Sequence, residues 1–221
     1  MPRFLRNPLV RLPLIFIGVY LGMLLLGQYA GISKGYRGMI RNVSTTIFQE
    51  NWSLGLVQFR EPGDQFGKGL ETAVDFVNRE ENNRAAAEGR GVNAVTVYFS
   101  IHNWGFLLGA FLIALIVASP VNIKRKAWAA GIGLLLFHFY LLFRIWLKLE
   151  WEMDTHPELG IVDLSDFWSG AIDKLNVVLV QNIVVSFLVV TIIWILVTFR
   201  KEDWDGFSKM IRVQPKPRSA S

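Results

Sequence analysis

Long apolar runs dominate the pattern of this 221-residue chain. The clearest pair, residues 104–119 and 127–147, is separated only by the short polar segment 120–126. The core of so small a chain cannot bury both runs together with two more, so we expect this pair to form a transmembrane helical hairpin. The runs 12–30 and 175–198 have the length of two further transmembrane helices. The pattern therefore predicts a membrane all-α protein with four transmembrane helices.

A polar region, residues 31–103, lies between the first and second of these runs. Its segments 39–48, 54–59 and 94–101 are rich in β-branched and aromatic residues, which favours β-strands. Within segment 66–88, apolar residues recur at intervals of three and four, which favours an amphipathic helix. We therefore expect a small α+β extracytoplasmic domain inserted between transmembrane helices 1 and 2.

Charged residues are distributed unevenly along the chain. Segments 1–11, 120–126 and 199–221 together carry 12 Lys or Arg residues against 3 Asp or Glu residues, whereas segment 148–174 carries 2 against 7. Because short basic segments stay in the cytoplasm, we expect a multi-pass protein of the bacterial inner membrane with both termini cytoplasmic and the acidic loop outside. The basic segments indicate contact with anionic membrane lipids and not with nucleic acid.

Composition narrows the classes of function. Hydrophobic residues make up 52% of the chain, which is typical of an integral membrane protein. The chain has no cysteine, which excludes disulfides, thiolate metal sites and cysteine nucleophiles. The run 12–30 follows basic residues as a secretory signal does, but it is longer than a signal's apolar core, so we expect an uncleaved helix. Common nucleophile, zinc-protease, phosphate-loop and dinucleotide motifs are missing from the sequence, which weighs against an enzyme.

A few polar and small residues interrupt the apolar runs. Arg144 either reaches the lipid headgroups or makes a charge-assisted contact with Gln181, Asn182 or an acidic residue of a partner. Gln181 and Asn182 are also expected to form hydrogen bonds between helices. Gly18 and Gly22 form a Gly-x3-Gly pair suited to close helix packing, although glycine is common in membrane helices generally.

The polar stretch that follows Arg144 has two interpretations. If the third helix continues, Lys148, Glu152 and His156 share a face with Arg144, and Lys148 can pair with Glu152. If the chain is extended, alternate side chains gather on one side. That geometry would suit a hard divalent cation or zinc, with ligands from Glu150, Glu152, Asp154, His156 and Glu158. A solvated acidic rim is the competing interpretation.

Two histidines near the predicted hairpin raise a haem hypothesis. His102 lies at the start of the second run and His138 lies inside the third. At 1.5 Å per residue their depths in the membrane differ by about 9 Å, which is too large for one haem iron unless the helices are shifted. Hydrogen-bonded core histidines are the alternative.

Two stretches of sequence resemble a known family. The first is Asn-Pro-Leu at 7–9 with Leu-Pro-Leu at 12–14, and the second is the apolar run 103–120 after an outer loop of about 70 residues. In these features the chain resembles the small polytopic membrane proteins that accompany bacterial exosortases, although its acidic loop and basic tail depart from that pattern. The resemblance implies an accessory role in export of envelope or surface proteins, and it brings no catalytic residue.

These patterns lead us to expect a non-enzymatic accessory or assembly subunit. Such a subunit would bind a larger membrane or envelope complex through its outer domain and helix faces. The alternative is a membrane-embedded metal- or haem-binding protein, or an enzyme, that uses the acidic cluster with His156. No cofactor is favoured.

Overall fold

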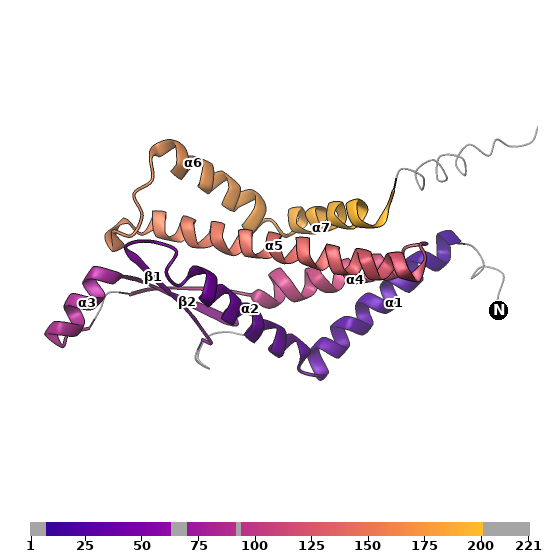
Figure 1. Ribbon diagram of the computed structural model, residues 1–221, viewed down its shortest axis with the longest axis horizontal. Helices are drawn as coiled ribbons and strands as arrows, with labels where there is room; N and C mark the ends of the chain where they lie inside the picture. Colours follow the sequence, from indigo (N-terminus) through magenta and orange to yellow (C-terminus); the bar gives the residue numbers. More distant parts are fainter. Residues whose placement is uncertain (1–7, 63–69, 92–93, 201–221) are drawn as a thin grey trace, which may run out of the picture.

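The computed structural model describes residues 8–62, 70–91 and 94–200. Apolar helices lie side by side at one end of the molecule, and a small α+β head lies at the other (Figure 1). The helical end contains α1 (Pro8–Tyr29), α4 (Leu107–Ala118), α5 (Ile123–Thr155) and α7 (Ile183–Thr198), and α4 contacts each of the other three. The predicted basic tail, 199–221, lies outside the described residues from residue 201 onward.

The prediction of four transmembrane helices is wrong. Two described helices are long and apolar enough to cross a membrane, Val10–Tyr29 and Ile123–Thr155. A third span is added if Asp166–Gln181 and Ile183–Thr198 count together, but these two helices meet at an angle of 78°. The helix His102–Ala118 is apolar but short of the roughly 20 residues that usually cross a bilayer core. The finding is compatible with placement in a membrane.

The run 175–198, predicted as one helix, is broken. Helix α6 (Asp166–Leu175) passes into a π-helical turn, η4 (Asn176–Gln181), and Asn182 then adopts an extended conformation with φ −90° and ψ 101°. Asn182 is the N-cap of α7, because its side chain accepts hydrogen bonds from the backbone of that helix. The surrounding valines and isoleucines keep the hydropathy high across the break, so the apolar pattern did not reveal it.

In the head, the prediction of a strand at 39–48 is wrong, because these residues form part of a helix. The helix is α2 (Ile32–Phe48). The buried side chains of Ile40, Ser44 and Phe48 recur every fourth residue, as on one face of a helix. The strands predicted at 54–59 and 94–101 are confirmed as β1 (Gly55–Arg60) and β3 (Ala94–Phe99).

The helix predicted at 66–88 is only partly correct. Its middle forms β2 (Thr72–Asn78), the central strand of an antiparallel sheet in the order β1-β2-β3. Only α3 (Arg79–Glu88) is helical, and it starts where the Asn78 side chain accepts hydrogen bonds from the next turn. The start of the predicted segment, residues 66–69, lies outside the described residues.

The sheet and the long helix α5 share one hydrophobic core. Val57, Phe76 and Phe99 of the three strands belong to the same buried cluster as Leu141 and Ile145 of α5. With 33 residues, α5 is about 50 Å long, so it extends well beyond a bilayer core of about 30 Å. Its C-terminal half is therefore the support on which the head is packed.

Candidate functional site

Arg144 is the most deeply buried charged residue of the described chain. Its exposed fraction is 0%, and its Nη2 donates a hydrogen bond of 3.0 Å to the carbonyl oxygen of Val180. The guanidinium carbon lies 4.8 Å from the ring centroid of Trp104 and 5.7 Å from that of Tyr140. Arg144 therefore points into the protein and does not reach toward headgroups.

The break at Asn182 explains why Val180 accepts this bond. In a continuous α-helix, the Val180 carbonyl would accept from the backbone N–H of Val184. Here the Asn182 Oδ1 accepts from the N–H groups of Val184, at 3.0 Å, and Val185, at 3.4 Å. The predicted contact of Arg144 with the side chain of Gln181 or Asn182 is thus replaced by a contact with the backbone that Asn182 frees.

Other polar atoms near this break are buried without hydrogen-bond partners in the described part of the chain. They are the Nε and Nη1 of Arg144 and both side-chain polar atoms of Asn176. Unpaired buried polar groups are rare in proteins, because each costs about 1–3 kcal/mol. The region around η4 therefore contains a cluster of buried polar atoms between apolar helices.

The acidic stretch after Arg144 is helical to Thr155. Lys148 forms an ion pair with Glu152, as the helical interpretation predicted, and the His156 Nε2 lies 4.0 Å from a Glu152 oxygen. The extended geometry on which the metal hypothesis depended is not formed. Within the described ranges, no group of three His, Cys, Asp or Glu side chains is placed to hold a metal ion.

The remaining acidic residues of this stretch make structural contacts. Glu150 Oε2 accepts a 2.8 Å hydrogen bond from the Trp52 indole N–H, which joins α5 to the head. Asp154 Oδ2 accepts a 2.6 Å bond from the Ser169 hydroxyl of α6. Glu158 lies 2.8 Å from His156 Nδ1.

The two histidines lie at different sites. His138 Nδ1 lies 2.7 Å from the carbonyl oxygen of Leu134 in its own helix, whereas His102 Nδ1 lies 2.7 Å from the Ser33 hydroxyl. The Phe106 ring stacks on His102 at 5.3 Å, and the next ring, Tyr36, lies 5.9 Å from His138. Each histidine therefore has its own hydrogen-bond partner, and aromatic rings bridge the space between them.

The glycine that brings α1 close to a neighbour is not one of the predicted pair. A Cβ atom built on Gly18 or Gly22 meets no atom within 4 Å, so these two line an open face of α1 in the described structure. A Cβ atom on Gly27 would lie 2.1 Å from the Phe106 ring. Gly27 is therefore the position where α1 packs closely against η2 (His102–Phe106).

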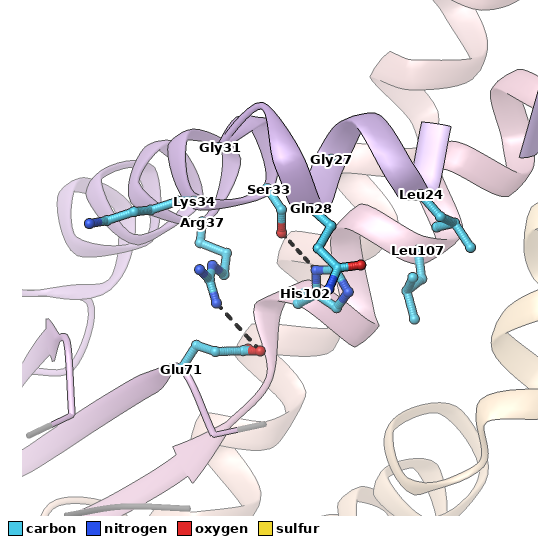
Figure 2. Close-up of a pocket in the computed structure, with 10 residues that line it drawn as sticks. All are labelled: Leu24, Gly27, Gln28, Gly31, Ser33, Lys34, Arg37, Glu71, His102 and Leu107. Carbon is cyan, nitrogen blue, oxygen red and sulfur yellow. Dashed lines mark hydrogen bonds and ion pairs between the residues drawn. The ribbon is translucent and has the colours of Figure 1, made fainter. Parts of the chain in front are cut away.

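A polar cavity of about 460 Å³ lies next to this contact, at the elbow between α1 and α2. Gly31 forms the elbow with φ 68°, a conformation that glycine adopts without steric cost. In Figure 2, Arg37 points toward Glu71 while Gln28 lies beside His102. The wall nearer α4 is apolar, with Leu24 and Leu107.

One acidic residue, Glu71, lines the cavity and pairs with Arg37. Arg37 Nη1 lies 3.4 Å from Glu71 Oε1, and the other Glu71 oxygen accepts a 2.7 Å hydrogen bond from Ser100. Burial lowers the pKa of His102 below its usual range, so this imidazole is neutral near pH 7. The sequence reasoning did not identify this cavity. Its one signal was the row of basic residues Lys34, Arg37 and Arg41 directly after the first apolar run.

Comparison of the chain with protein-family models, curated proteins and solved structures gave no match.

Proposed function

We propose that this protein is a non-enzymatic accessory or assembly subunit of the bacterial inner membrane, which presents its α+β head to a larger membrane or envelope complex. The observation that carries the proposal is the core shared by the sheet and α5. A head packed on a helix that continues into the membrane is held at a fixed height and orientation. That is the mechanical requirement for a subunit that positions a partner beside the membrane.

The distribution of charge supports an orientation with the head outside the cytoplasm. The start of α1, the turn between α4 and α5, and the end of α7 all lie at the end of the molecule away from the head (Figure 1). This end carries Arg11, Arg200 and the basic triplet 124–126. Because basic segments remain on the cytoplasmic side, both chain ends are proposed to face the cytoplasm.

An open strand edge gives the head a means of binding an extended segment of a partner. In the described sheet, β3 pairs with β2 on one side only, whereas β1 has a further backbone hydrogen bond of 3.3 Å from Val57 to Gln49. An exposed edge supplies unpaired backbone groups to which another chain can add a strand. An envelope-export complex, the class implied by the resemblance in residues 103–120, is the proposed partner.

Site-directed photocrosslinking in cells tests this proposal. A photoreactive residue replaces Ala94, an exposed residue of β3, and a matched control replaces Ala86, an exposed residue of α3. We expect a discrete adduct with one envelope protein from position 94 and not from position 86. A chain that gives no adduct at position 94 and migrates as a 25.1 kDa monomer in native gels would refute the assignment as a subunit.

A further inference from the structure

The polar cavity at the elbow straddles the level where the first membrane-spanning helix ends. The candidate span Val10–Tyr29 stops within the cavity wall, which continues from Leu24 through the elbow to Arg37. In a bilayer, the side of the cavity near Leu24 would therefore lie at the depth of the lipid acyl chains. The side near Arg37 would lie at the depth of the headgroups. A volume of about 460 Å³ is within the range of sites that bind small molecules.

The polar half of the cavity is suited to a phosphate group. Arg37 is paired with Glu71 at 3.4 Å, a separation that leaves guanidinium N–H groups available to a second acceptor. Lys34 forms no ion pair or hydrogen bond in the described ranges, and Figure 2 shows its ammonium group pointing outward along α2. Ser33 and Gln28 add neutral polar groups. With His102 neutral, Lys34 and Arg37 outweigh the single carboxylate of Glu71.

The apolar side of the cavity leads to a surface that lipid chains can cover. Leu24 and Leu107 form this wall, and the neighbouring α1 side chains Leu21, Leu25 and Leu26 are 52%, 55% and 61% exposed. An exposed apolar helix face at this depth is covered by acyl chains in a bilayer. A soluble anion would use only the polar half of the site, whereas a phosphate-bearing lipid would use both.

We propose that the cavity binds the phosphate group of an anionic membrane lipid, with Arg37 as its cationic ligand, with Lys34 turning inward to supply a second positive charge, and with the acyl chains along α1 beside Leu24 and Leu107. The lipid would then join the end of the span to the base of the head. This site extends the account beyond the proposed subunit function and does not depend on it.

Titration of the purified full chain in a neutral detergent, followed by native mass spectrometry, tests the site. We expect saturable binding of one dioctanoyl phosphatidylglycerol molecule and at least about tenfold weaker binding of dioctanoylglycerol, which has the same chains without the phosphate. Sodium phosphate at ten times the lipid concentration should not displace the phospholipid. Equal binding of dioctanoylglycerol, or displacement by phosphate, would overturn the proposal.

Substitutions assign the binding to this cavity. Arg37→Gln should weaken phospholipid binding at least about tenfold, because it removes a charge-assisted hydrogen bond to the phosphate group. Lys34→Gln removes a charge without breaking a hydrogen bond or ion pair of the described chain, so it keeps the test valid if Arg37→Gln disturbs Glu71. Arg90→Gln, on the exposed Arg90–Glu88 pair of the head, is the matched control and should have no effect. Unchanged binding in both cavity variants would place the lipid elsewhere and overturn the proposal.

Discussion

The Arg144 guanidinium and the Val180 carbonyl are joined by a buried hydrogen bond of 3.0 Å across two helices. The acceptor is available because Asn182 caps α7 and takes the N–H group that Val180 would otherwise bind. A buried arginine and a helix break thus depend on each other. Without the break, the Arg144 guanidinium would lack this acceptor, and without Arg144, the Val180 carbonyl would lack this donor.

This dependence predicts strong coupling between substitutions at residues 144 and 182. Arg144→Met leaves the Val180 carbonyl unpaired, and Asn182→Val favours a continuous helix that withdraws the acceptor from Arg144. We expect Asn182→Val to lower the free energy of unfolding in mixed detergent micelles. The double variant should be more stable than the sum of the two single effects predicts, with a coupling of about 1–3 kcal/mol.

Asn182→Asp is the matched control for this cycle. An aspartate also caps a helix N-terminus, so it should retain the break and the Arg144 contact. Strictly additive effects of Arg144→Met and Asn182→Val would show that the arginine and the break are independent.

The close approach at Gly27 predicts an unusual glycine effect. Alanine in place of glycine normally stabilises a helix interior by about 1 kcal/mol. Gly22→Ala, where the new Cβ meets no atom within 4 Å, should show that gain. Gly27→Ala should instead destabilise the chain by about 1–3 kcal/mol, because its Cβ overlaps the Phe106 ring. Thermal unfolding of the two variants in detergent measures the difference, and equal stability would mean that α1 does not pack on η2 as described.

The acidic stretch predicts the outcome of a triple substitution. Glu152→Gln, Asp154→Asn and His156→Gln together remove three of the five candidate metal ligands, at and just after the end of α5. If the protein is an assembly subunit, the photocrosslink from position 94 and the cellular phenotype should both persist. Loss of the phenotype with the crosslink intact would show that these side chains carry chemistry and would reject the proposed function.

The head should lose stability in acid through Asp75. Burial alone would raise the pKa of this carboxyl, but hydrogen bonds from Arg60, at 2.5 Å, and Thr96, at 2.6 Å, hold the pKa below its ordinary value of 3.8. A lowered folded pKa stabilises the head above pH 3.8, and this contribution is lost as the pH falls through the folded pKa. Thermal unfolding followed by near-ultraviolet circular dichroism between pH 7 and pH 3 should show this loss.

Asp75→Asn should flatten that pH dependence, since it removes the titrating group. Asp163→Asn, at an exposed position outside the head, is the control and should leave the profile unchanged. An Asp75→Asn profile that matches the parent would assign the acid sensitivity to other carboxylates.

Part of this fold could be predicted from sequence and part could not, for identifiable reasons. Hydropathy located the apolar helices, and β-branched residues located β1 and β3. Strand β2 was missed because its apolar residues Ala73, Val74 and Val77 also fit a helical spacing. The break in 175–198 was hidden by valine and isoleucine, and its signal was the polar residues Asn176, Gln181 and Asn182.

The site was less predictable than the fold. Arg144 stood out in the sequence, but its acceptor is a backbone carbonyl that exists only because the helix breaks, and a backbone group has no residue signature. The elbow cavity brings Arg37 and Glu71 together from different elements, so no local spacing reveals it. In the acidic stretch, the helical alternative correctly predicted the pairing of Lys148 with Glu152.

Cysteine labelling in spheroplasts tests the central claim most directly, since the natural chain has no cysteine. Asn83→Cys places one thiol on the exposed surface of α3 in the head, and Lys124→Cys places one on the exposed first turn of α5, at the opposite end of the molecule. A membrane-impermeant maleimide should label the Asn83→Cys variant in intact spheroplasts. It should label the Lys124→Cys variant only after lysis. The reverse pattern, with position 124 labelled in intact spheroplasts and position 83 protected, would contradict the presentation of the head outside the cytoplasm.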